Sequence, residues 1–92
     1  MPKTIIITGK QQKLVNKIRF DLNVDCFESQ MYSCTLSETD IPKIKRQIET
    51  YKKMKSISSS PTFLTLYSDI ILDLGLIIKL YNLAEEKEAT SD

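Results

Sequence analysis

The chain has 92 residues, of which 41% are hydrophobic and 27% are charged, and its formal net charge is +1. This size and composition are those of one ordinary globular domain, and they exclude a disordered polyelectrolyte and a histone-like polycation. The small net charge hides an asymmetry, because residues 1–55 carry eleven Lys and Arg against six Asp and Glu, whereas residues 56–92 carry two against six. We therefore expect a single domain over residues 1–92 whose N-terminal part is basic.

Three segments of the N-terminal part have the pattern of β-strands. Residues 4–8 form the β-branched run TIIIT, which ends at Gly9 and is typical of a strand followed by a turn. Between residues 12 and 26 apolar and polar positions alternate, and this period of two predicts a long second strand with a bend near Asn16. Residues 31–36 alternate again after a turn at 27–30. Together these segments predict a three-stranded antiparallel meander.

Two helices are predicted to follow the meander. Residues 37–40 supply capping hydroxyls and acidic side chains, and Pro42 suits a first helical turn, so a helix is expected over residues 40–56. Ser60 before Pro61 repeats this signature and predicts a second helix that ends at about Glu86, with residues 87–92 as a frayed tail. The expected fold class is thus α+β in the order β-β-β-α-α.

The second predicted helix is apolar around most of its circumference. Such a helix is normally buried on several sides, and a small meander with one narrow-striped helix leaves part of this one uncovered. We therefore predict a non-enzymatic protein-binding module that self-associates as a homo-oligomer or docks on a protein partner through this helix. The residues expected to face the partner are Leu66, Ile70, Leu74, Ile77 and Tyr81, with Leu64, Ile71 and Ile78 facing inward.

The same helix is not expected to cross a membrane. It carries Asp69, Asp73 and Lys79, and each charge near a bilayer centre costs about 2.5–3.5 kcal/mol on insertion scales. The apolar run near the N-terminus is too short for a signal peptide, so a cytoplasmic protein without a membrane partner is expected.

The first predicted helix carries most of the basic charge, with Glu49 as its one acid after the cap. Beside Lys13, Lys17 and Arg19 this charge could bind nucleic acid phosphates in a salt-dependent way, although exposed lysines usually face only solvent. The alternative function is therefore a small nucleic-acid-binding regulator. Its candidate contacts are Lys43, Lys45, Arg46, Lys52, Lys53 and Lys55.

No constellation of catalytic residues is visible. The chain has no histidine, which removes the usual general base, and it gives Asp69 and Asp73 no imidazole partner. Cys26 and Cys34 are the only cysteines, and we expect them to be buried, reduced thiols without zinc. The segment IIITGK lacks the second glycine of a phosphate-binding loop, and the segment from Asp21 lacks the glycine and glutamate of a calcium loop.

We accordingly predict no catalytic residue, metal, cofactor or small-molecule substrate. A third hypothesis is a compact inhibitor of a host enzyme or defence system encoded by a mobile element, which small size and lysine richness permit.

Overall fold

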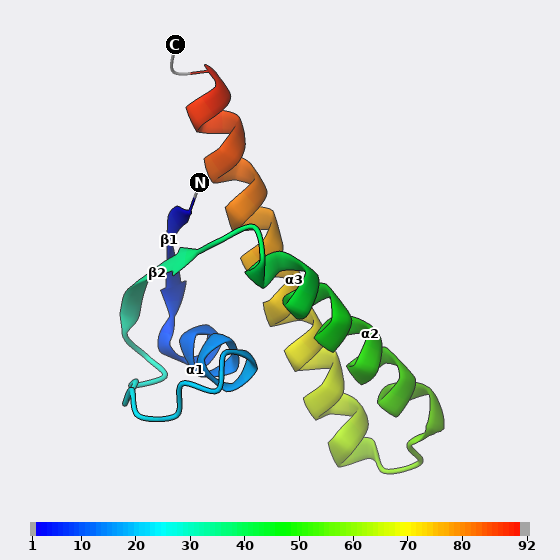
Figure 1. Ribbon diagram of the computed structural model, residues 1–92. Coiled ribbons are helices and arrows are strands. Elements are labelled where there is room, and N and C mark those ends of the chain that lie inside the picture. Colours follow the sequence, from blue (N-terminus) through cyan, green and yellow to red (C-terminus); the bar gives the residue numbers. More distant parts are fainter. Residues whose placement is uncertain (1, 91–92) are drawn as a thin grey trace.

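The computed structural model describes residues 2–90, with side chains as far as Lys87. The elements follow in the order β1 (Lys3–Thr8), α1 (Gly9–Ile18), β2 (Met31–Leu36), α2 (Asp40–Ile57) and α3 (Pro61–Thr90). The small sheet and α1 lie on one side of α3, and α2 runs antiparallel to the first half of α3 (Figure 1). The α+β class is confirmed, but within the described residues the sheet has two strands and there are three helices.

The predicted second strand over residues 12–26 is wrong, because its first part is α1 and the rest is the loop 19–30. A capping box starts the helix: the Gln11 backbone N–H donates to Thr8 Oγ1 at 3.1 Å, and the Thr8 N–H donates to Gln11 Oε1 at 3.0 Å. These bonds satisfy two backbone N–H groups at the start of α1, which have no partner within the helix. Gly9 is required at this corner because a Cβ would lie 1.8 Å from the Phe27 carbonyl oxygen.

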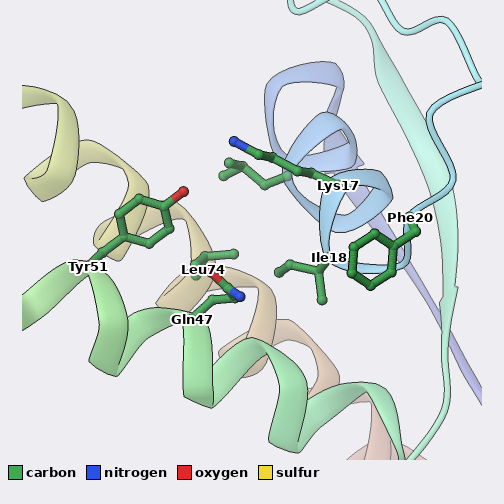
Figure 2. Close-up of a pocket in the computed structure, with 7 residues that line it drawn as sticks. Lys17, Ile18, Phe20, Gln47, Tyr51 and Leu74 are labelled. Atoms are coloured by element: carbon green, nitrogen blue, oxygen red, sulfur yellow. The ribbon is translucent and has the colours of Figure 1, made fainter. Parts of the chain in front are cut away.

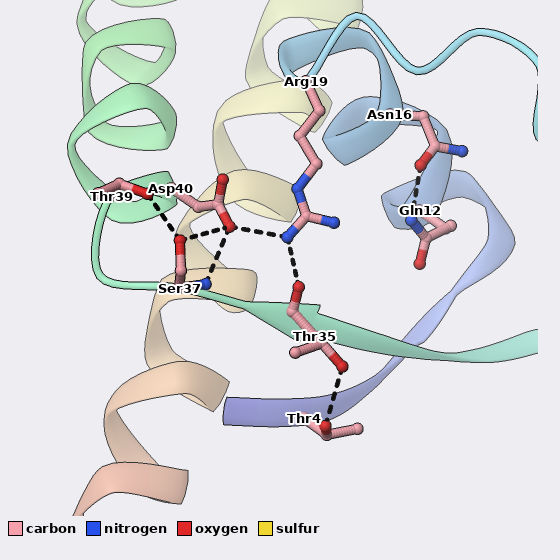
Figure 3. Close-up of polar contacts among 8 residues, drawn as sticks. All are labelled: Thr4, Gln12, Asn16, Arg19, Thr35, Ser37, Thr39 and Asp40. Atoms are coloured by element: carbon pink, nitrogen blue, oxygen red, sulfur yellow. Dashed lines mark hydrogen bonds and ion pairs between the residues drawn. The ribbon is translucent and has the colours of Figure 1, made fainter. Parts of the chain in front are cut away.

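The two remaining strands pair in antiparallel register, with Ile5 opposite Cys34 and Ile7 opposite Tyr32. Alternate side chains therefore point to opposite faces of the sheet. The inner face carries Ile5, Ile7, Cys34 and Leu36, which are buried in the core. On the outer face the hydroxyls of Thr4 and Thr35 form a hydrogen bond of 3.0 Å (Figure 3).

Arg19 connects the end of α1 to the sheet and to the start of α2 (Figure 3). Its guanidinium donates to the Thr35 carbonyl oxygen and, at 2.8 Å, to Asp40 Oδ2, which also accepts from the Ser37 backbone N–H at 2.9 Å. Burial alone would raise the pKa of Asp40, but the hydrogen bonds from Arg19 and Ser37 outweigh burial and lower it. This ion pair is therefore a structural link among three elements.

The long helix α3 begins at Pro61, as predicted, and continues past Glu86 to Thr90. Residues 87–90 of the expected frayed tail are thus helical, and residues 91–92 lie outside the described part of the chain. Gly75 lies within α3, and beyond the backbone of the helix itself no atom lies within 4 Å of the position that a Cβ would occupy. Within the described residues, no helix has the length and apolarity that crossing a bilayer requires.

Candidate functional site

Three of the five residues predicted to face a partner lie inside the protein. Leu74, Ile77 and Tyr81 are buried in the core beneath the sheet and α2, so their expected outward orientation is wrong. Ile70 is half-buried against the same core, and Leu66 is exposed. The residues predicted to point inward, Leu64, Ile71 and Ile78, are all half-buried. A helix that is apolar all round gives no periodic signal from which its rotation can be read.

The exposed face of α3 carries a different apolar stripe. Leu72, Leu76 and Leu83 follow at spacings of four and seven residues, so they share one side of the helix. Their side chains are 64%, 41% and 47% exposed, respectively. These leucines are uncovered, whereas Leu74, Ile77 and Tyr81 on the opposite face of α3 are buried.

A groove joins this stripe to β1. Ile6 on the outer face of β1 is 54% exposed, and it lines the groove together with Leu80 and Leu83 of α3. Leu83 belongs both to the stripe and to the groove. We call these five residues together the α3–β1 surface: Ile6, Leu72, Leu76, Leu80 and Leu83. The groove is also lined by Thr4, Ile5, Ala84, Glu86 and Lys87.

The edge of β1 beside β2 is paired, whereas no described strand pairs with its other edge. Backbone N–H and C=O groups on such an edge can hydrogen-bond to an added strand. The α3–β1 surface therefore combines apolar side chains with a strand edge that no described strand pairs with.

The loop 19–30 presents a second group of exposed apolar side chains, which comprises Phe20, Leu22, Val24 and Phe27. Phe20 is 89% exposed, and its φ of 59° places it in the left-handed region that favours glycine. The Asp21 N–H donates to the Asn16 carbonyl at 2.8 Å and the Phe20 N–H to the Lys17 carbonyl at 3.2 Å, the two bonds of a Schellman motif. The fold therefore holds an exposed aromatic ring at a helix end where glycine is the usual residue.

The other end of this loop is held by buried contacts. Cys26 is buried and accepts a hydrogen bond from the Asn16 side-chain amide at 3.7 Å. The Phe27 backbone N–H donates to the Tyr32 hydroxyl at 2.8 Å. The loop is thus anchored at both ends while its apolar side chains point away from the core.

A cleft of about 220 Å³ lies between α1 and α2 (Figure 2). Its apolar walls come from Leu14, Ile18 and Leu74, and Phe20 stands at its rim. Lys17 from α1 and Gln47 and Tyr51 from α2 also line it. The sequence prediction did not find this cleft, because residues 12–18 were assigned to a strand.

All six basic residues proposed for nucleic acid binding are exposed on α2. At about 100° per residue they spread around more than one side of the helix, and Arg46 and Lys53 point most directly away from α3. Lys52 also pairs with Glu49 at 3.6 Å. These basic side chains are therefore exposed, but they do not lie together on one face of α2.

The candidate acid pair on α3 is divided between two environments. Asp73 is half-buried, with its Oδ2 3.5 Å from Lys10 Nζ and its Oδ1 accepting from the Gln11 amide at 3.4 Å. Asp69 is exposed. Asp73 thus links α1 to α3, which gives this carboxylate a structural role.

The two thiols are also enclosed by the fold. Cys26 and Cys34 are free and buried, as predicted, and burial raises the pKa of the Cys34 thiol although the Arg19 charge opposes the shift. Within the described residues, no three potential ligands of the His, Cys, Asp and Glu types gather where they could hold a metal ion. The exposed apolar surfaces are therefore the strongest functional candidates.

Comparison with known proteins adds no relative, since no family model, curated protein or solved structure matches the chain.

Proposed function

We propose that the protein is a non-enzymatic protein-binding module that self-associates or docks on a protein partner through the α3–β1 surface. The observation that carries the proposal is the stripe of exposed leucines on α3, one of which, Leu83, shares a groove with Ile6 of β1, a strand whose second edge pairs with no described strand. Contiguous exposed apolar side chains of this kind commonly mark protein interfaces. A second copy of the chain is the first occupant to test, because it offers the same apolar surface and the same strand edge.

The energy available at this surface is sufficient for a modest interface. Ile6, Leu72, Leu76 and Leu83 are each about half exposed. Covering all four would contribute about 4 kcal/mol, because full burial of one such side chain is worth about 1.5–3 kcal/mol. Backbone hydrogen bonds along β1 would add about 0.5–1.5 kcal/mol each, and association costs are subtracted from the total. We therefore expect association that is visible only at high protein concentration.

The test is sedimentation of the wild type and of Leu76→Asp over a range of concentrations. The wild type should shift from monomer to dimer as concentration rises, and Leu76→Asp should remain monomeric because a carboxylate would be desolvated in the interface. Asn82→Asp is the matched control, since Asn82 is exposed on α3 away from the stripe and the change adds the same charge. Dimerisation of Leu76→Asp like the wild type would contradict self-association through this surface, as would a wild type that stays monomeric throughout.

Docking on a different protein requires a separate measurement. A photo-cross-linking residue at position 72 should give a defined protein adduct in cells of the source organism, whereas one at position 82 should not. Equal labelling from both positions, or labelling from neither, would refute docking through the α3–β1 surface.

A second candidate function is nucleic acid binding through α2. It is favoured by the exposure of all six basic side chains, of which Lys52 pairs with a neighbouring acid. Lys45→Glu should then weaken binding to a nucleic acid duplex, and affinity should fall steeply as salt rises. Absent or salt-independent binding would remove this candidate.

A further inference from the structure

The cleft between α1 and α2 differs from the α3–β1 surface in shape and chemistry. It is a partly enclosed space in which apolar walls meet a small number of polar groups, whereas the α3–β1 surface is an open stripe. Leu74 is fully buried at its base, and Leu14 and Ile18 of α1 are half-buried beside it. Apolar walls with few, convergent polar groups are typical of ligand sites.

The polar groups of the cleft share the ability to donate hydrogen bonds. The Lys17 ammonium, the Gln47 amide and the Tyr51 hydroxyl can all donate hydrogen bonds, and no residue that lines the cleft is acidic. In Figure 2, Lys17 from α1 and Tyr51 and Gln47 from α2 extend toward the space between the two helices. Within the described part of the chain, the side chains of these three residues form no hydrogen bond or ion pair. The cleft therefore offers a positive charge and donors that have no hydrogen-bond or ion-pair partner among the described side chains.

The volume of the cleft limits what it can hold. About 220 Å³ is below the roughly 300–1,000 Å³ of sites for drug-sized ligands. At about 30 Å³ for a water-sized group, it accommodates roughly seven or eight non-hydrogen atoms.

We propose that this cleft is a binding site for a small amphipathic carboxylate, with a short aliphatic chain against Leu14, Ile18 and Leu74 and the carboxylate on Lys17. Gln47 and Tyr51 line the same cleft, and their side chains can donate further hydrogen bonds to the carboxylate. Phe20 stands at the rim with its ring in solvent, so a bound chain would cover part of an otherwise exposed aromatic surface.

The probe is hexanoate, which has about eight non-hydrogen atoms and fits the estimated capacity of the cleft. Titration is followed by NMR on the methyl groups of Leu14, Ile18 and Leu74. Hexanoate should shift these methyl signals in a saturable way, with a dissociation constant in the millimolar range. Hexanol and hexylamine carry the same chain without a negative charge, and they should bind about fivefold more weakly or not at all.

The decisive variant is Lys17→Gln, which should weaken hexanoate binding by about fivefold and leave hexanol binding unchanged. Lys13→Gln is its matched control, because Lys13 lies one turn earlier on α1, pairs with Glu28 at 3.6 Å and does not line the cleft. Equal binding of hexanoate and hexanol by the wild type would overturn the proposal, as would hexanoate binding that Lys17→Gln leaves unchanged. Methyl signals that do not respond to hexanoate would also overturn it.

Discussion

Phe20 is the position at which the structure allows the sharpest test of backbone energetics. Its φ of 59° costs an L-residue about 1–2 kcal/mol, and glycine avoids this cost. The ring is 89% exposed, so only about 20 Å² of its roughly 200 Å² is buried, which is worth about 0.5 kcal/mol. Glycine also raises the entropy of the unfolded chain, which offsets about 0.4–1 kcal/mol of the gain.

These terms give different expectations for two substitutions at the same site. Phe20→Ala loses the small contact of the ring but keeps the left-handed cost, so it should be less stable than the wild type by about 0.5 kcal/mol. Phe20→Gly loses the same contact, but it also removes the cost of the left-handed backbone. Its free energy of unfolding should therefore be about 1 kcal/mol higher than that of Phe20→Ala.

The assay is reversible unfolding in urea at fixed pH, supported by thermal melts. A difference of 1 kcal/mol corresponds to about 4–8 °C in Tm for a domain of this size. The comparison between the alanine and glycine variants matters most, because both lack the ring and differ only in their backbone preference. If Phe20→Ala were as stable as Phe20→Gly, the Schellman geometry assigned to the end of α1 would be refuted.

Two further changes test the helix and the ion pair. Gly75→Ala should stabilise the protein by about 1 kcal/mol in urea unfolding, because Gly75 lies within α3 and a Cβ there meets nothing within 4 Å beyond the backbone of the helix itself; a loss of stability would show that α3 needs this glycine for a kink or a contact. The lowered pKa of Asp40 means that its contribution is complete above the unfolded value of about 4 and is lost as pH falls through the lower folded value. The wild type should therefore lose stability on acidification more steeply than Asp40→Asn below about pH 4, and parallel pH profiles would contradict a stabilising pair with Arg19.

Elements whose local signals agree with their packing were predictable from the sequence. The run of β-branched residues before Gly9 is β1, and residues 31–36 are β2. Helices α2 and α3 begin at the two predicted signatures, although the N-cap residue Thr39 of α2 makes no side-chain capping bond. The strand predicted over residues 12–26 was wrong because the alternation of apolar and polar residues continues across the end of α1 into the loop 19–30. The capping box formed by Thr8 and Gln11 was the visible signal for α1, and its hydrogen bonds decide the local structure.

The rotation of α3 was beyond prediction for a different reason. With apolar residues on every side, the helix can bury any face, and the choice depends on where β1 and α2 pack. Leu74 and Ile77 therefore lie in the core while Leu72 and Leu76 lie outside it, although all four look alike in the sequence. The cleft beside α1 could not be found either, because it exists only where α1 is helical and lies across from Tyr51.

The exposed apolar residues lie at positions where glycine or a polar residue would be compatible with the fold. Glycine at position 20 would relieve the left-handed backbone, and a polar residue at position 72 or 76 would not replace a core side chain, since neither leucine belongs to the buried cluster. Strain and exposed apolar area that the fold itself does not need are typical of surfaces that bind something else. The same inference covers Phe20 at the rim of the cleft and the leucines of the α3–β1 surface. Their variants should therefore separate stability from binding, with Phe20→Gly and Leu76→Asp remaining folded while association or ligand binding declines.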